Sequence, residues 1–473
     1  MRNLGSEAIN VRRGDAVAAA ARDDERGNPW LYWLLVCFAT LHGFLLVLDA
    51  RYPSMFLRGD RAVARIAEIE ELRHLSNWRE LVVYLGTHGN IGDYAPQALL
   101  YLAGGKSLLV ISQICLMLLS GICVYRLARL CKLSARASCL ATALYLGSPH
   151  SLALPHQLCT EALFVPFIVI SAWATVEAVR RSNRTVLSCG GLLSGISALV
   201  RPVALLWPVP VALGLYRYSA RAGAAVFAAA AYVPILLWMV FVWHETGTFG
   251  MGESGHSLAW NLYGRVAAIA TTLPPDEARA TTTRYLQHKN SLTTPSYLSF
   301  AAHYPLPVLI YAARDTAVFL FKSGVERITV DYFADDQQVQ ILQSRNGSGW
   351  RQYWDTHGAL ATVRYGWQVL GITLLISALA AAAQVVLIVL AVVGAVQVVG
   401  LIRHHAESAA SRVAEFLVLA APLYFLVFSQ LTDAAQSRHR APAEFALAIL
   451  ATHGVRRVLA AWRARTARHL AHT

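Results

Sequence analysis

The sequence carries little charge for its length. Only 15% of the 473 residues are Asp, Glu, Lys or Arg, whereas 56% are hydrophobic, and the mean hydropathy is +0.44. A water-soluble domain carries about 25% charged residues, so a soluble chain of this composition would leave much apolar surface exposed. The composition therefore predicts a membrane protein with several spans.

Several motifs of well-known chemistry are also missing. The chain contains no GxxxxGK[ST], HExxH or GxSxG pattern, which argues against nucleotide hydrolysis, zinc peptidase and serine hydrolase chemistry. None of the seven cysteines forms a CxxC pair, so neither a disulfide framework nor a zinc site is expected. The net charge of +13 does not indicate nucleic-acid binding, because membrane proteins collect basic residues on their cytoplasmic loops.

Apolar runs recur along the chain at lengths that approach a membrane span. A spanning helix needs about 20 mostly apolar residues. Ten runs approach this pattern: Trp30–Leu48, Gln97–Tyr125, Ala137–Pro149, Cys159–Val179, Val186–Val200, Pro202–Tyr216, Ala222–Trp243, Gln368–Ile402, Val413–Leu431 and Ala441–Val455. The stretch Val186–Tyr216 can also be one long helix broken at Pro202. The predicted fold is an all-α polytopic membrane protein with about ten transmembrane helices.

Basic residues in the short loops indicate which side of the membrane each loop faces. They cluster after the second, fourth, sixth, eighth and last predicted spans, whereas the loop 147–158 contains no Lys or Arg. Because Lys and Arg favour the cytoplasmic side, both termini are expected there, although the external segment 49–96 is itself rich in arginine. The expected parts are a cytoplasmic tail (1–29), an N-terminal transmembrane module (30–243) with an external loop (49–96), an external region (244–365), C-terminal transmembrane helices (366–455) and a basic cytoplasmic tail (456–473).

The first external loop contains a candidate general base. Apolar residues recur every three positions over Ala62–Leu75, which predicts an amphipathic helix on the membrane surface. Asp60 stands just before this helix and after Gly59, where a carboxylate can face a cavity and accept a proton. The alternative is that Asp60 caps the helix, since Asp is a favoured N-cap residue.

Ionisable residues at the ends of apolar runs form a second group of candidates. Glu161 lies at the outer entry of the fourth predicted span, and Arg201 lies at the outer end of the fifth. Such residues usually face a partner or a cavity, so the two are expected to pair, either as a structural clamp or as part of a polar cavity. Arg438 and Arg440 directly precede the last run, where they either bind an anionic group such as phosphate or anchor the helix at the interface.

Four segments of the chain share features with one superfamily. They are Gly59-Asp60, the run Thr160–Phe164 after the turn Ser148-Pro149, the run Gly191–Pro202, and the run Arg438–Glu444. Together they resemble bacterial polyprenyl-phosphate-dependent glycosyltransferases of the GT-C superfamily, which include protein O-mannosyltransferases and the aminoarabinose transferases that modify lipid A. The resemblance covers roughly Asp49–Tyr216 and the last two predicted spans.

The resemblance implies a GT-C-like topology and a specific reaction. The donor would be a polyprenyl-phosphate-linked sugar and the acceptor a glycan, a lipid or a protein, with no nucleic-acid partner. The catalytic carboxylates would be Asp60, Asp93 and Glu161, and the donor phosphate would be bound by Arg201, Arg438 and Arg440. The reaction would invert the anomeric carbon. The module 30–243 would be catalytic, and the region 244–365 would meet the acceptor.

Two departures from the superfamily pattern leave the base open. Ala64 stands where these enzymes often carry an aromatic residue, and Arg61 stands where some carry a second acid. Asp49 or Asp93 therefore remains an alternative to Asp60. No cofactor is certain from the sequence; a divalent cation is possible, but no residues form a convincing metal-ligand set.

The expected location is the bacterial plasma (inner) membrane, with the active site on its external, periplasmic side. Two other functions remain open. One is a polysaccharide polymerase or ligase that uses a diphosphate-linked donor, and the other is a transporter of a lipid or solute without chemistry. Against a transporter, the polar residues gather at the outer face rather than at mid-membrane.

The topology generates a labelling prediction. A cysteine introduced at Ala280 is expected to react with a membrane-impermeant maleimide in intact cells, whereas a cysteine at Arg465 is expected to react only after permeabilisation. Both variants are made in a background that lacks the seven native cysteines. Labelling at position 465 in intact cells, without labelling at position 280, would reverse the orientation.

Overall fold

The structure is a computed structural model. It describes residues 28–51, 62–71, 74, 80, 84, 91–247, 304–324, 348–403, 408–432 and 437–472. Asp60 lies outside the described residues. Asp49, Asp93 and Arg438 lie in described helices, but their side chains are outside the description.

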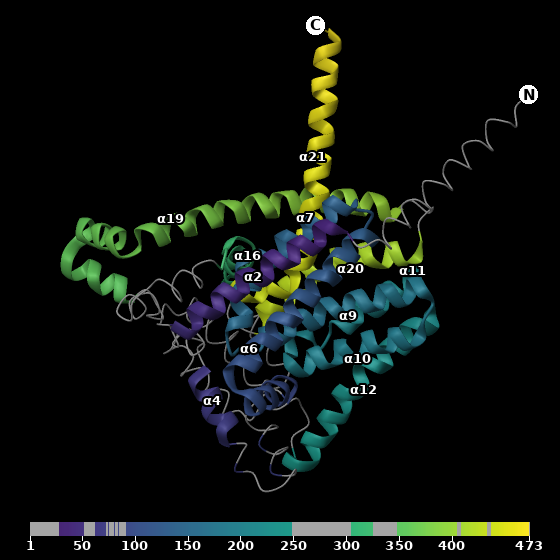
Figure 1. Ribbon diagram of the computed structural model, residues 1–473, viewed down its shortest axis with the longest axis horizontal. Helices are drawn as coiled ribbons and strands as arrows, with labels where there is room; N and C mark the ends of the chain where they lie inside the picture. Colours follow the sequence, from purple (N-terminus) through teal and green to yellow (C-terminus); the bar gives the residue numbers. More distant parts are fainter. Residues whose placement is uncertain are drawn as a thin grey trace, which may run out of the picture.

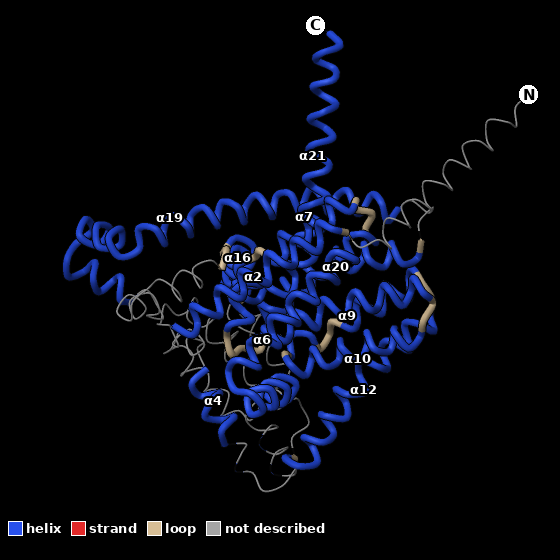
Figure 2. The backbone as a smooth tube through the Cα atoms, in the orientation of Figure 1, coloured by secondary structure: helices blue, strands red, loops and turns tan. Residues whose placement is uncertain are grey.

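Every regular element among the described residues is a helix, and Figure 2 shows these helices joined by loops. In chain order they are α2 (Pro29–Arg51), α4 (Ala62–Glu71), α6 (Ile91–Leu130), α7 (Ala135–Leu146), α8 (Pro149–Ala153), η2 (Leu154–His156), α9 (Glu161–Arg181), α10 (Arg184–Val200), η3 (Pro202–Ala204), α11 (Pro208–Tyr218), α12 (Arg221–Thr246), α16 (Pro305–Phe321), α19 (Ser348–Arg403), α20 (Ala409–Thr432), η4 (Ser437–Ala443) and α21 (Glu444–His472). The expected all-α polytopic membrane fold is confirmed.

The number of full-length spans is smaller than the sequence predicts. Seven described helices are long and apolar enough to cross a membrane: Pro29–Leu48, Ala95–Leu130, Glu161–Arg181, Arg221–Glu245, Leu375–Arg403, Ala409–Phe428 and His439–Leu470. The other three predicted spans form α7, α10 and α11, of 12, 17 and 11 residues. At about 1.5 Å per residue these helices are shorter than the roughly 30 Å hydrocarbon core.

Local sequence explains why these helices are short. Ser148 caps α8, whose first residue is Pro149, so the chain turns directly after α7. Pro202 ends α10, because Arg201 adopts an extended backbone with φ −146° and ψ 116°, as the residue before a proline favours. Pro208 then starts α11. The predicted break at Pro202 is confirmed.

The main core lies among α6, α7, α9, α20 and α21, which pack together in the centre of the molecule (Figure 1). Trp207, next to the start of α11, stacks on Phe425 of α20 with ring centroids 5.4 Å apart. Phe164 of α9 meets the edge of the same Phe425 ring at 6.0 Å. The Tyr424 hydroxyl donates to the Val203 carbonyl at 2.7 Å. These contacts hold the break between α10 and α11 against α20.

A smaller core fixes the helix that the sequence assigns to the first external loop. The predicted amphipathic helix is present as α4, and its Ile69 side chain is fully buried. Ile69 packs with Leu109 and Val110 of α6 and with Leu158, just before α9. The apolar face of α4 therefore contacts protein at Ile69, which the sequence pattern alone assigned to the membrane surface.

Close backbone contacts at glycines join two pairs of helices. A Cβ built on Gly191 or Gly195 of α10 would lie 2.5 Å or 2.2 Å from a carbonyl oxygen of α12. A Cβ on Gly394 of α19 would lie 1.8 Å from the Leu450 oxygen of α21. Small residues allow such close helix packing in membranes. Part of the Gly191–Pro202 motif therefore serves packing.

The far end of α21 projects from the body of the molecule (Figure 1). Arg456, Arg457, Arg463, Arg465 and Arg468 are exposed there. The helix runs without interruption from Glu444 to His472. The predicted basic tail 456–473 is therefore a continuation of the last helix through His472, the last residue that the structure describes.

The close contact at Gly394 leads to a prediction about stability. Alanine should destabilise the protein at Gly394 but not at Gly400, another glycine of α19. Gly394→Ala is expected to destabilise the protein by about 1–3 kcal/mol or more, because the new methyl group overlaps the backbone of α21. Gly400→Ala is the matched control, since a Cβ there meets no atom within 4 Å. Alanine favours helix by roughly 0.5–1 kcal/mol over glycine, so the control should be neutral or stabilised. Thermal unfolding of the three proteins in one detergent measures the difference; an unchanged melting temperature in Gly394→Ala would contradict the close contact.

Candidate functional site

The connection between α7 and α9 is the most polar buried segment near the predicted site. It runs over residues 147–160 and contains α8 and η2. Its polar side chains His150, Ser151, His156 and Gln157 are all buried. The sequence assigns this loop to the external side, because it contains no Lys or Arg. In the structure the loop is packed inside the protein, where its polar groups require partners from other helices.

The predicted pair of Glu161 and Arg201 is confirmed. Glu161 is the first residue of α9, and Arg201 follows the last residue of α10, so two helix ends bring the side chains together. The Arg201 guanidinium forms an ion pair with the Glu161 carboxylate and donates to the Thr160 hydroxyl at 3.3 Å. The Thr160 hydroxyl in turn donates to Glu161 at 2.9 Å.

The two partners of this pair differ in exposure. The Glu161 side chain is 2% exposed, whereas the Arg201 side chain is 15% exposed. The carboxylate is therefore shielded from solvent, and Arg201 is the more exposed member of the pair.

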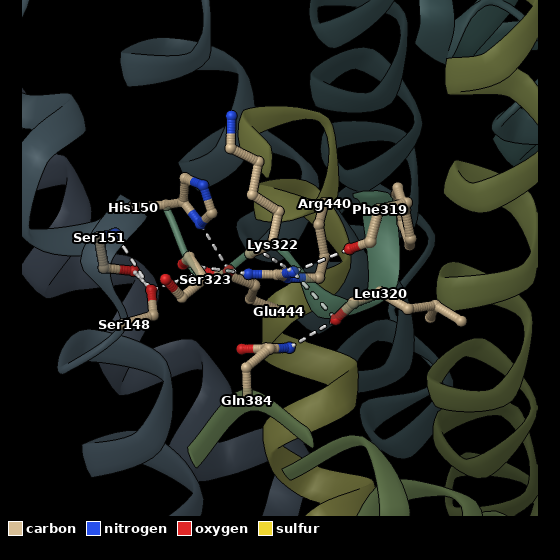
Figure 3. Close-up of polar contacts among 10 residues, drawn as sticks. All are labelled: Ser148, His150, Ser151, Phe319, Leu320, Lys322, Ser323, Gln384, Arg440 and Glu444. Atoms are coloured by element: carbon tan, nitrogen blue, oxygen red, sulfur yellow. Dashed lines mark hydrogen bonds and ion pairs between the residues drawn. The ribbon is translucent and has the colours of Figure 1, made fainter. Parts of the chain in front are cut away.

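A second polar cluster forms around the buried carboxylate of Glu444, at the start of α21 (Figure 3). Its Oε1 accepts from His150 Nδ1 at 2.7 Å and from Arg440 Nε at 3.3 Å. Its Oε2 accepts from the Ser148 hydroxyl at 2.6 Å. We call these four residues, Ser148, His150, Arg440 and Glu444, the Glu444 cluster. It fastens α8 to the beginning of the last helix.

Arg440 also holds the end of α16. Its side chain is fully buried. Its Nη1 donates to the carbonyls of Phe319, Leu320 and Lys322 at 2.8–3.2 Å, and its Nη2 donates to the Ser323 carbonyl at 3.3 Å (Figure 3). The last carbonyls of a helix lack partners within the helix, and a cation there also interacts favourably with the helix dipole. Arg440 therefore caps α16.

A third polar contact joins α2 to the same connection. His42 Nδ1 and His156 Nε2 are 3.0 Å apart, and both side chains are buried. Close by in the chain, the amide of Gln97 on α6 donates to the Cys159 carbonyl at 2.9 Å. The connection 147–160 thus receives side chains from α2, α6, α21 and, through Arg201, from the end of α10.

The predicted site residues separate into groups. Glu161 and Arg201 meet, whereas Arg440 is bound to Glu444 and to the end of α16. The side chains of three other predicted residues, Asp60, Asp93 and Arg438, lie outside the part of the chain that the structure describes. The roles that the resemblance implies for all six residues stay predictions.

Sequence reasoning missed the two histidines His150 and His156. One signal for the Glu444 cluster was present, because Glu444 is an ionisable residue at the start of an apolar run and the turn at Ser148 belongs to the same resemblance. No local pattern links the two, since they lie 296 positions apart. Among the residues that the structure describes, no group of three His, Cys, Asp or Glu side chains is placed to hold a metal ion.

The buried cap at Arg440 generates a stability prediction. Arg440→Ala removes one partner of a buried ion pair and leaves the α16 carbonyls without a donor. Such a loss costs about 3–5 kcal/mol, so the variant is expected to melt well below the wild type or to fail to accumulate. Arg457→Ala on the exposed part of α21 is the control and should melt like the wild type. A wild-type melting temperature in Arg440→Ala would show that the cap is dispensable.

Comparison with known proteins identifies a family without assigning an activity. The family model described as "Predicted membrane protein (DUF2079)" matches residues 71–321. No curated protein matches the chain. The matched range includes the whole connection 147–160 together with Glu161 and Arg201. Since the match covers more than half of the 473 residues, the chain belongs to the DUF2079 family of predicted membrane proteins.

Proposed function

We propose that the protein is a glycosyltransferase that moves a sugar from a polyprenyl-phosphate donor to an acceptor hydroxyl at the external face of the membrane. The observation that carries the proposal is the arrangement of Arg201. A buried carboxylate holds the guanidinium in place at the meeting point of two helix ends, and part of the arginine side chain stays exposed.

The chemistry explains why such an arginine is needed. The acceptor oxygen attacks the anomeric carbon while the bond from that carbon to the phosphate oxygen breaks. Negative charge then grows on the leaving lipid phosphate, and a fixed cation stabilises this charge most when it is already oriented. Glu161 and Thr160 provide that orientation for Arg201. Arginine also suits phosphate because its planar fork makes paired hydrogen bonds.

The membrane setting supports the same reading. The donor's lipid tail lies in the bilayer, so the protein needs no nucleotide site to bind an activated sugar. The polar residues that the helices bring together lie at helix ends, where a headgroup-sized ligand can approach. The acceptor attacks opposite the leaving phosphate, which gives inversion at the anomeric carbon. The proton acceptor that the sequence indicates is Asp60, with Asp49, Asp93 and Glu161 as alternatives. Glu161 is the weakest of these candidates, because it is engaged with Arg201.

A deletion strain tests the proposal. Loss of the protein should leave a polyprenyl-phosphate sugar unconsumed and remove one sugar from a surface glycan, lipid or protein, as measured by mass spectrometry of lipid extracts and of the envelope. Wild-type protein should restore the product. Accumulation of a diphosphate-linked donor would indicate a polymerase or ligase instead, and movement of an intact lipid or solute without a new glycosidic bond would indicate a transporter.

Substitution of Arg201 sharpens this test. Arg201→Lys keeps the charge but loses the paired donors, and we expect the transfer rate to fall by about 10²–10³-fold, the range found for removal of one charge-stabilising donor. Arg184→Lys at the exposed opposite end of α10 is the matched control and should transfer at the wild-type rate. Equal rates for both variants, measured in proteoliposomes with a membrane extract as donor source, would refute a role for Arg201 in phosphate binding.

A further inference from the structure

The Glu444 cluster holds the imidazole ring of His150 in one orientation. The carboxylate of Glu444 receives donors from His150, Ser148 and Arg440, so its own position is fixed from three sides. The His150 side chain is 2% exposed and Nδ1 is 2.7 Å from the carboxylate. A ring nitrogen at hydrogen-bond distance from a carboxylate donates to it, which assigns the proton to Nδ1.

This assignment leaves Nε2 of His150 as the proton-accepting nitrogen. Among the residues that the structure describes, Nε2 has no hydrogen-bond partner, although the atom is buried. Buried polar atoms are nearly always paired, and an unpaired one calls for an explanation such as a catalytic role or a missing ligand.

The residue next to Nε2 is a glycine, Gly324. Gly324 follows the end of α16 with φ +83°, and a Cβ built on it would lie 2.6 Å from Nε2. Arg440 holds the carbonyls of Lys322 and Ser323, just before this glycine. Glycine is what lets the backbone pass directly against Nε2, so the acceptor hydroxyl of the proposed reaction reaches this nitrogen only if residues 322–324 move aside.

We propose that His150, oriented by Glu444, is the general base that accepts the proton of the acceptor hydroxyl. The inference rests on the proposed sugar transfer and assigns to His150 the role that the sequence indicated for Asp60. An acidic residue that orients a histidine through Nδ1, so that Nε2 takes a proton, is a recurrent arrangement in catalysis.

The proposed step balances. The acceptor hydroxyl gives its proton to His150 Nε2 while its oxygen forms the bond to the anomeric carbon. The bond between that carbon and the donor phosphate oxygen breaks, and the electron pair leaves with the phosphate. The imidazolium that results is stabilised by the Glu444 carboxylate and returns its proton to water when the product departs.

A purely structural role would need less than the structure provides. A clamp between α8 and α21 uses only the bond from Nδ1 to Glu444, which an asparagine amide can also make. It gives no reason for an imidazole whose other nitrogen lies unpaired against a glycine. The same connection of fourteen residues, 147–160, also leads directly into Glu161, the partner of Arg201. The proposed base therefore belongs to this segment, and the proposed phosphate-binding Arg201 is bound at its end by Thr160 and Glu161.

The variant His150→Asn separates the two roles. Its amide can donate to Glu444 in place of Nδ1 but offers no basic nitrogen, so it should fold and melt near the wild type while transfer falls by about 10²–10⁴-fold, the usual contribution of a general base. His453→Asn is the matched control, since His453 is a buried histidine on the same α21 that carries Glu444. The control should transfer at the wild-type rate. Full transfer by His150→Asn would overturn the proposal.

Comparison with Asp60→Asn decides between the two candidate bases. We expect His150→Asn to lose transfer by about 10²–10⁴-fold and Asp60→Asn to stay within a few-fold of the wild-type rate. If Asp60→Asn loses transfer by that factor and His150→Asn does not, the base is Asp60 and the proposal fails. A wild-type protein that transfers no sugar refutes the proposed function. If the wild type transfers sugar and His150→Asn is equally active, only the role of His150 as the base is refuted.

An independent measurement uses no activity at all. Solid-state nitrogen NMR of the full chain with ¹⁵N-labelled histidine, with His150→Asn as the difference sample, reports which ring nitrogen carries the proton. We expect the signal lost in the variant to show a protonated Nδ1 and an unprotonated Nε2. A His150 protonated at Nε2 in the resting protein would overturn the assignment of the base.

Discussion

The apolar surroundings of the connection 147–160 make an unpaired polar group costly, and its polar side chains are bound by residues from other helices. Water is scarce inside a helical membrane protein, so an unpaired hydroxyl, imidazole or carboxylate there is costly. Ser148 and His150 are bound by Glu444, His156 by His42, and Thr160 by Arg201. Three distant parts of the chain are thereby held at one short segment, and the positions of His150, Glu161 and Arg201 depend on it.

The two buried arginine–carboxylate pairs show how exposure separates structural from ligand-binding roles. Arg440 is fully buried and gives its donors to Glu444 and to the end of α16. Arg201 pairs with Glu161 in a similar way, yet part of its side chain stays accessible. Both carboxylates neutralise a charge that would otherwise be expensive to bury. The difference in exposure, rather than the pairing itself, makes Arg201 the better candidate for a phosphate.

Much of the fold follows from local sequence, because apolar runs and prolines act over short distances. The long helices, the break at Pro202, the helix of the first loop and the pairing of Glu161 with Arg201 were all predictable from such signals. The lengths of α7 and α11 were less so, because an apolar stretch does not reveal where one helix ends and the next begins, as at Ser148-Pro149 and at Pro208.

The Glu444 cluster was beyond sequence reasoning for a different reason. Its members come from positions separated by almost 300 residues, and no periodic pattern links a histidine in one turn to a glutamate before the last helix. The contact of Arg440 with the end of α16 was not predictable either, because its acceptors are backbone carbonyls, which no residue type in the sequence indicates.

The separation of Ser148 and Glu444 by 296 positions also bears on how the protein is made. The chain is synthesised from its N-terminus, so α7, α9 and α16 are made well before α21. Until the last helix arrives, the imidazole of His150 and the terminal carbonyls of α16 lack the partners that Glu444 and Arg440 provide. The unfinished chain therefore presents unsatisfied polar groups. Docking of α21 completes the helix bundle and the candidate site in the same event, so a chain truncated before Arg440 would lose both together.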